Sequence, residues 1–328
     1  GQGQGQAGRG QNSTVFEPSP AEIDQAIARG RKMAQGKEAL EFPKGDGLRI
    51  VMTGHSWVAP GRKALPAIAA AAGMDGHRQR SHTSGGGTGS ANAIWLKEFG
   101  KWGKGVPPMP ILVPAIATGA WDVMTWGGSY DDKTVYFAQW IELCLKYNPD
   151  MVFYIQDGWP RFEPGDKDLP PAEYRKVLDA RLAKTRTSLF QTRFEELEER
   201  FPGKVHIIPA SRAVVDLIHQ YLDGKIKEID CVDERSQGGK RGIYRDGGHL
   251  SRTSGIEQLV GYLYYGMLYR KSPATIKGYT PADVPPAFDR RMREAAWRAI
   301  VESPFAGIDD DDRDGVADVD EAGSEDAH

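Results

Sequence analysis

Three polar residues have the types and the order that nucleophilic catalysis by a serine requires. Ser56 follows the apolar run LRIVMTG in the segment GHSW, and Asp246 and His249 lie together in DGGHLS. A serine hydroxyl becomes a strong nucleophile when a base takes its proton, and that base needs an acceptor that fixes its tautomer. An Asp three residues before a His, separated by two glycines, can fold back so that one loop supplies both partners. We therefore predict a triad of these residues; the alternative is a pair of ordinary surface turns.

The elements that position these residues are indicated by apolar runs that alternate with helical stretches. Buried strands are predicted at residues 48–54, 121–126, 151–157 and 205–211. Helices are predicted at residues 20–40, 64–73, 171–201, in the segment after 205–211 to about 222, and at 253–269. This alternation favours an α/β fold with a central parallel sheet that helices cover on both faces. Functional groups of such sheets gather beyond the carboxyl ends of the strands, which is where Ser56 falls.

GHSW and DGGHLS together resemble the first and last motif blocks of the SGNH (GDSL-like) serine hydrolases. Weaker matches, including WDVMTW and NPDMVFYIQDGWPR, extend the resemblance over about residues 48–270. The resemblance implies a three-layer α/β/α sandwich and the hydrolysis of esters, often of acyl groups on carbohydrates. It also implies roles: Ser56 attacks the acyl carbonyl, His249 acts as general base and then as general acid, and Asp246 orients His249.

The resemblance further implies an oxyanion hole built from the backbone N–H of Ser56 and of a glycine in GGGTGS, either Gly86 or Gly87. The third block of the family usually adds an Asn side chain, and the matching segment here, WDVMTWGGS, has none. The backbone of Gly127 or the side chain of Gln156 could take its place. This departure leaves room for an inactive relative, and a plain glycine turn remains the alternative for GGGTGS.

Three tryptophans near the predicted strand ends, Trp57, Trp126 and Trp159, are candidate substrate contacts. Flat rings with a polar edge suit the apolar face of a sugar, although burial in the core is the common alternative for tryptophan. Arg161 could bind an acidic group of the substrate, but a surface ion pair is the simpler interpretation.

Residues 310–321, DDDRDGVADVDE, match the calcium-loop template D-x-D-x-D-G-x5-E. The predicted ligands are the side chains of Asp310, Asp312, Asp314, Asp318 and Glu321 and, at position seven of the loop, the backbone carbonyl of Val316. The flanking segments show no exit helix, so the loop resembles the single aspartate-rich calcium repeats of secreted bacterial proteins more than an EF-hand. A bound Ca²⁺ is therefore the one cofactor predicted, and a solvated acidic tail is the alternative.

The overall composition limits the classes to which the chain can belong. Its 328 residues, 40% of them hydrophobic, suit a disordered tail at 1–20, one catalytic domain at 21–300 and an acidic tail at 301–328. The net charge of -3 provides no global attraction for nucleic acid. No stretch reaches the roughly 20 apolar residues of a membrane span. The opening GQGQGQAGRGQNS is typical of a processed, mature protein, so we expect export from a bacterial cell.

Cysteine and histidine usage excludes further chemistries. Cys144 and Cys231 are too few for a disulfide framework and too far apart for a zinc motif; a single disulfide between them stays open. The seven histidines form no HxH or HExxH cluster, which argues against metal-dependent hydrolysis. His55 and His82 are expected to line the pocket.

These observations favour a secreted serine esterase that removes acyl groups, acetyl above all, from a small-molecule or polysaccharide ester. One alternative is a lipase or general carboxylesterase, although no long apolar lid segment is evident. Another is a non-catalytic carbohydrate-binding protein on the same scaffold. The acyl group and the oligomeric state are not specified by the sequence.

Overall fold

A five-stranded parallel sheet in the order β2-β1-β3-β4-β5 forms the centre of the molecule. The structure is a computed structural model that describes residues 15–84, 90–128, 132–185, 190–318 and 320. The strands are β1 (Arg49–Gly54), β2 (Arg78–Thr83), β3 (Val123–Gly127), β4 (Val152–Gln156) and β5 (Val205–Ile208). A separate pair of short parallel strands, β6 (Cys231–Asp233) and β7 (Gly242–Tyr244), lies outside this sheet.

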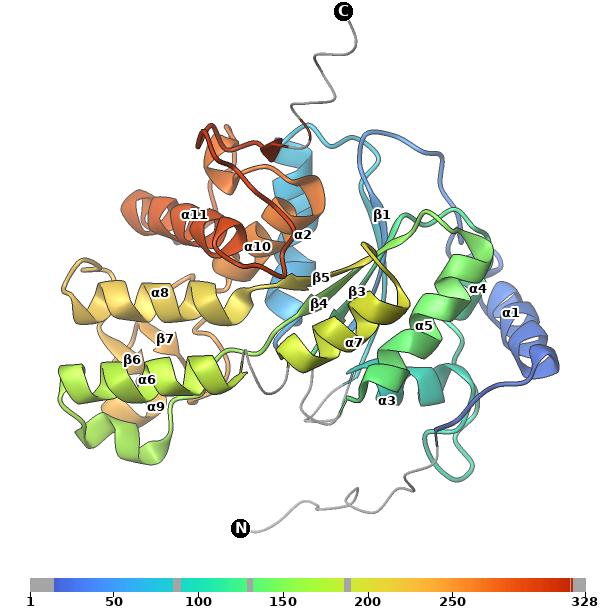
Figure 1. Cartoon of the computed structure of the whole chain (residues 1–328), viewed down its shortest axis with the longest axis horizontal. Coiled ribbons are helices and arrows are strands. Elements are labelled where there is room, and N and C mark those ends of the chain that lie inside the picture. Colours follow the sequence, from blue (N-terminus) through green and yellow to red (C-terminus); the bar gives the residue numbers. More distant parts are fainter. Residues whose placement is uncertain (1–14, 85–89, 129–131, 186–189, 319, 321–328) are drawn as a thin grey trace, which may run out of the picture.

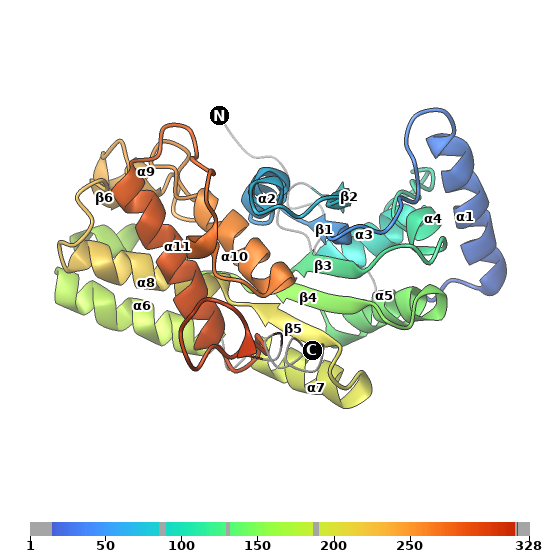
Figure 2. The ribbon, with the colours of Figure 1, turned by 90° about the horizontal axis from the view of Figure 1, so that it is seen from above.

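Helices form a layer on each face of the sheet (Figures 1 and 2). One layer contains α2 (Ala59–Ala71), α8 (Ala210–Leu222), α10 (Gln258–Tyr269) and α11 (Pro286–Val301). The other contains α3 (Ser90–Glu98), α5 (Thr134–Tyr147) and α7 (Thr192–Arg200). The remaining helices are α1 (Pro20–Ala34), α4 (Val113–Ile116), α6 (Pro171–Thr185), α9 (Glu234–Gln237) and the 3-10 turns η1 (Pro164–Asp168) and η3 (Pro273–Thr275).

Alternate residues of the central strands enter opposite halves of the core. Ile50 and Met52 of β1 belong to the cluster beneath α2 and α10, whereas Val51 belongs to the cluster beneath α3 and α5. Such burial on both faces explains why these strands read as continuous apolar runs in the sequence. The predicted three-layer α/β/α fold with a parallel sheet is confirmed.

Several elements differ from those predicted. The edge strand β2 was missed because its sequence, RQRSHT, contains no apolar run, a composition that suits a strand with one unpaired edge. The single long helix expected at 171–201 is instead α6 and α7, and the expected loop after residue 82 leads into α3. Helix α11 was also missed, because the proline-rich composition around it resembles a linker.

The two cysteines are both free thiols, buried in separate places, so the disulfide left open by the sequence does not form. Cys144 lies on the buried face of α5 in one core cluster, and Cys231 begins β6. Across the described part of the chain, none of the helices has the length and apolarity that crossing a membrane would need.

A buried carboxylate joins the edge strand to the segment that enters α4. Glu98, at the end of α3, has no exposed surface. It accepts hydrogen bonds from the backbone N–H groups of Ile111, Leu112 and Val113 at 2.9–3.1 Å. It also contacts Nδ1 of His82 at 2.6 Å. His82, which we expected to line the pocket, is therefore a buried structural residue.

Replacement of Glu98 by alanine is expected to destabilise the fold strongly. The three backbone donors and His82 would lose a common acceptor inside the core, a loss that typically costs about 3 kcal/mol or more. Urea unfolding measures the change. Glu173→Ala, which removes an exposed carboxylate 2.9 Å from Lys176, is the matched control and should change little. Equal losses in the two variants would contradict this interpretation of Glu98.

Candidate active site

The strand order places a switch point at β1 and β3, two neighbours whose connections leave in opposite directions. Ligands of open α/β sheets bind beyond the carboxyl ends of strands at such a point. Ser56 lies two residues beyond the end of β1, where the chain turns toward α2, and it is exposed to solvent. The predicted nucleophile thus lies where this topology favours a ligand site.

Ser56, His249 and Asp246 are brought into one hydrogen-bonded chain. The Ser56 Oγ lies 2.9 Å from Nε2 of His249, and Nδ1 of His249 lies 2.9 Å and 3.0 Å from the two oxygens of Asp246. Because an ionised carboxylate only accepts hydrogen bonds, Nδ1 carries the proton, and Nε2 is left to accept from the serine hydroxyl. This arrangement is competent to move a proton away from the Ser56 hydroxyl.

The Asp246 carboxyl is held ionised by hydrogen bonds rather than by exposure. Its burial alone would raise its pKa. The backbone N–H of His249 at 2.8 Å, the His249 ring and the backbone N–H of Gly248 at 3.2 Å oppose that effect. The net result lowers the pKa of Asp246 from an ordinary value of 3.8 to about 2. The carboxylate is therefore available to orient His249 throughout the neutral and mildly acidic range.

The loop that carries Asp246 and His249 runs from β7 to α10, and its backbone is held at several points. Gly247 accepts from the Phe162 N–H at 2.8 Å and donates to the buried Asp233 at 2.5 Å. Gly248 accepts from the indole N–H of Trp159 at 2.8 Å. Gly247 has a φ of +77°, and an added Cβ would lie 2.7 Å from the Phe162 carbonyl, so glycine is required there.

Asp233 is a positioning residue that the sequence did not reveal. One of its oxygens caps α9 through the Ser236 N–H at 2.9 Å, and the other receives the Gly247 bond. The segment CVDERS carries the signal of a helix cap, but the second bond joins residues fourteen positions apart. Only the folded arrangement of β6 beside the loop could identify it.

Of the three tryptophans predicted to contact substrate, Trp57 alone is not fully buried. It is half-buried and stacks on Trp159, with ring centroids 4.6 Å apart and planes 12° from parallel. Trp159 is only 1% exposed, and Trp126 is fully buried against Phe137 and Phe153. The predicted substrate contacts of Trp126 and Trp159 are therefore wrong, because neither side chain offers a surface that a substrate could reach.

His55 and Gln156 support the nucleophile turn from beneath. Nδ1 of His55 accepts from the Trp57 N–H at 3.3 Å, so its Nε2 carries the proton and donates to the Gly128 carbonyl at 3.3 Å. Burial, aided by the nearby charge of His249, lowers the pKa of His55, although its bond to Gly128 opposes the shift. Gln156 donates its amide N–H to the Trp57 carbonyl at 3.2 Å.

The predicted oxyanion donors are placed only in part. Gly86 and Gly87 lie outside the described residues. Gly127 ends β3 directly against the nucleophile turn, since an added Cβ would lie 2.4 Å from Val58 and 3.2 Å from the His55 ring. Gln156 uses one amide N–H on Trp57, which leaves its second N–H as the one an oxyanion could use. The participation of these groups stays a prediction.

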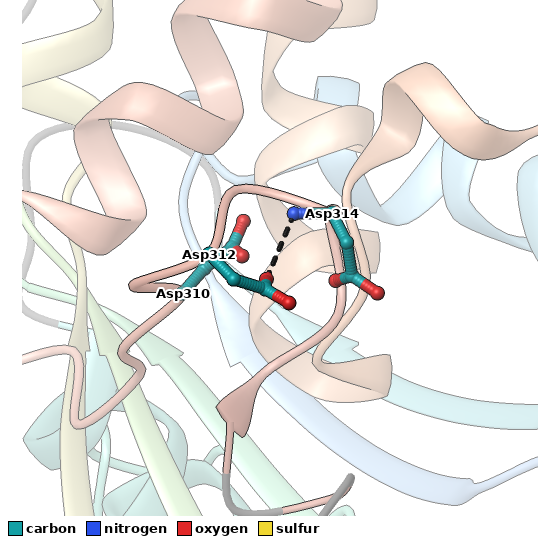
Figure 3. Close-up of side chains that lie close together, drawn as sticks. All are labelled: Asp310, Asp312 and Asp314. Atoms are coloured by element: carbon teal, nitrogen blue, oxygen red, sulfur yellow. Dashed lines mark hydrogen bonds between the residues drawn. The ribbon is translucent and has the colours of Figure 1, made fainter.

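The acidic loop folds against the rest of the molecule and gathers three of its carboxylates (Figure 3). Oxygens of Asp310, Asp312 and Asp314 lie within 4.8 Å of one another. Oδ2 of Asp310 accepts from the indole of Trp297 at 2.7 Å and from the Gly315 N–H at 3.2 Å. Oδ1 of Asp310 is buried and has no hydrogen-bond partner among the described residues. An orphaned carboxylate oxygen between two other carboxylates fits a hard cation such as Ca²⁺.

The remaining predicted calcium ligands are less clearly placed. Val316 forms an isolated bridge with Lys271, and both oxygens of Asp318 accept from the Asp311 N–H at 3.1–3.2 Å. Glu321 lies outside the described residues. The bridge to Lys271 and the Trp297 bond nevertheless hold this loop on α11 and on the end of α10.

No family model matches this chain, and no curated protein does either. Among solved structures, it resembles a DUF4886 family protein from Bacteroides uniformis at a TM-score of 0.52 and 13% identity, over 78% of this chain and 96% of that one. It is more distantly similar to the C-terminal catalytic domain of a peptidoglycan O-acetyltransferase, OatA, from Streptococcus pneumoniae. That match has a TM-score of 0.30 and 12% identity over 69% and 93% of the two chains, too remote to carry an argument. The first likeness supports the α/β/α fold.

The Asp246 carboxyl is expected to titrate near pH 2, and carbon-detected NMR with Asp246→Asn for assignment would measure this. Because its pKa is lowered in the folded state, its contribution to stability is present above about pH 4 and is lost as the pH falls toward 2. His249→Ala would remove the ring but keep the backbone N–H, so the pKa should rise only part of the way. A value near 4 in the wild type would contradict the hydrogen-bond account.

Proposed function

We propose that this protein is a serine esterase of the SGNH type that removes acyl groups, above all acetyl, from carbohydrate esters. The observation that carries the proposal is the hydrogen-bonded chain from the exposed Ser56 through His249 to Asp246. Its place beyond the switch point of an α/β/α sheet supports the same conclusion. The proposal includes export from a bacterial cell.

In the proposed reaction, Ser56 Oγ bonds to the acyl carbon while its proton passes to Nε2 of His249. The carbonyl electron pair moves onto the oxygen, which the Ser56 backbone N–H and further donors stabilise. When the bond from carbon to the alcohol oxygen breaks, His249 returns the proton to that oxygen and an acyl-enzyme remains. Water then attacks the acyl carbon with His249 again as base, and the acid leaves as Ser56 regains its proton.

The aromatic surface beside the nucleophile favours a carbohydrate as the alcohol. Trp57 is half-buried, and its flat ring is fixed by its stack on Trp159. A rigid indole face offers an apolar surface of the kind that sugar rings stack on, and its edge remains polar. A lipase or general carboxylesterase would instead be indicated by a preference for long acyl chains.

Hydrolysis of p-nitrophenyl acetate is expected from the wild type and should fall by about 10³-fold or more in Ser56→Ala, because the nucleophile is lost. Asp246→Asn should lower kcat by about 10³–10⁴-fold, because an amide at this position favours the tautomer of His249 that cannot accept the Ser56 proton. Initial rates over a series of acyl chain lengths measure both effects and separate an acetylesterase from a lipase.

Asp24→Asn, an exposed substitution on α1, is the matched control and should leave the rate unchanged. Thermal unfolding of each variant shows that it is folded. Hydrolysis that survives in Ser56→Ala would overturn the serine mechanism. If neither simple esters nor acetylated polysaccharides are hydrolysed by the folded wild type, the carbohydrate-binding alternative is supported.

We also propose that the acidic loop binds one Ca²⁺ ion through Asp310, Asp312 and Asp314. The buried, unpartnered Oδ1 of Asp310 favours this second activity. The ion would take no part in the ester chemistry. Because the loop contacts α11 through Trp297, the expected effect is on stability.

Addition of CaCl2 after EGTA treatment should raise the Tm, since a ligand bound only by the folded state stabilises it by mass action. The double variant Asp312→Asn with Asp314→Asn should lose this response. Differential scanning calorimetry measures it, with the exposed Asp75→Asn as a control that keeps it. An equal Tm of the wild type in CaCl2 and in EGTA would contradict the site.

A further inference from the structure

Arg161 places a guanidinium group directly against the loop that carries the triad base. A Cβ added to Gly248 would lie 3.1 Å from Nη2 and 3.2 Å from Cζ of Arg161, so the guanidinium covers the residue next to His249. The backbone around it is fixed, because its carbonyl accepts from Arg181 at 3.2 Å and the next residue, Phe162, donates to Gly247.

Among the residues that the structure describes, the Arg161 guanidinium has no partner of its own. No carboxylate forms an ion pair with it, and no acceptor takes a hydrogen bond from it, within the part of the chain that the structure describes. The surface ion pair that the sequence favoured is therefore not formed there. Arg181, by contrast, is held by both oxygens of Asp166 at 2.5 Å and 3.0 Å.

A second arginine adds positive charge to the same loop. Arg235 donates to the Asp246 carbonyl at 2.7 Å and, among the residues placed by the structure, likewise pairs with no carboxylate. Described carboxylates that face the loop are already engaged: Asp246 by His249 and by Arg245 at 3.5 Å, Asp233 by Gly247 and the cap of α9, and Glu234 by Ser251 and Thr253. Arg161 is thus an exposed arginine beside Gly248, the residue before His249, and it pairs with no carboxylate of the described residues, within a chain whose net charge is -3.

We propose that Arg161 binds an anionic group on the alcohol part of the ester, so that the preferred substrates are acyl esters of acidic carbohydrates such as those that contain uronic acids. This inference rests on the proposed esterase function. His249 protonates the alcohol oxygen, and therefore the alcohol lies on the His249 side of Ser56, where the guanidinium is. The planar guanidinium of arginine can donate two parallel hydrogen bonds to the two oxygens of a carboxylate, whereas the ammonium of lysine cannot. Arg161 touches no reacting atom and acts as a specificity residue.

Acetyl esters of three phenols that differ only in the para substituent test the effect of its charge: 4-acetoxybenzoate, 4-acetoxybenzenesulfonate and the neutral methyl 4-acetoxybenzoate. In Arg161→Gln, kcat/KM for 4-acetoxybenzoate should fall by about 10-fold or more, mostly through KM, because a charged hydrogen bond is lost. The methyl ester should be hydrolysed as by the wild type. Arg161→Lys should recover part of the loss, and the sulfonate shows whether any oxyanion or only a carboxylate is accepted.

Arg29→Gln removes the same charge from an exposed position on α1, a helix at the far end of the molecule from β6 and β7 (Figure 1). It should leave all three esters unaffected, because salt near 0.15 M screens charges beyond about 8 Å. Equal losses on charged and neutral esters in Arg161→Gln would make Arg161 a structural residue, and no loss on either would also overturn the proposal. If the folded wild type hydrolyses neither these esters nor acetylated polysaccharides, the esterase function itself fails. Hydrolysis that depends on Ser56 but not on Arg161 overturns only the anionic specificity.

Discussion

The geometry of the candidate site depends on one pair of indole rings. Trp57 follows the nucleophile on the turn after β1, and Trp159 follows β4, yet their rings stack in parallel at 4.6 Å. The indole N–H of Trp159 then binds the carbonyl of Gly248, beside His249. Three segments that are distant in sequence are thus joined by one rigid side chain, and the distance from Ser56 to His249 depends on that side chain.

The turn that presents Ser56 is fixed by contacts below it as well. Val58 packs so closely on Gly127 that no side chain could be added to the end of β3, and His55 links the turn to Gly128. Burial lowers the pKa of His55 and so favours the neutral ring in this link. In the proposed mechanism a neutral support matters, since a like charge near His249 would oppose formation of its imidazolium during proton transfer.

The sequence predicted the fold class and the grouping of Ser56, Asp246 and His249, since buried strands and short loop motifs are local signals. It did not predict β2, because edge strands need no apolar run, or the bond of Asp233 to Gly247, because that contact joins separate segments. Whether each tryptophan could contact a substrate was decided by how deeply its side chain is buried. Their positions at strand ends were evident, but whether a ring faces solvent or the core depends on neighbours that no local pattern specifies.

An exposed site must obtain its precision from hydrogen bonds, because water weakens the attraction between its charges. About a third of each of the His249 and Asp246 side chains is exposed, and Ser56 is open to solvent. The loop compensates with backbone N–H groups that fix the Asp246 carboxylate and with bonds to Trp159, Phe162 and Asp233 that fix the loop itself. Such openness also leaves room for the bulky alcohol of a polymeric ester. Recognition would then rest on groups at the surface, where Trp57 offers an apolar face and Arg161 a positive charge.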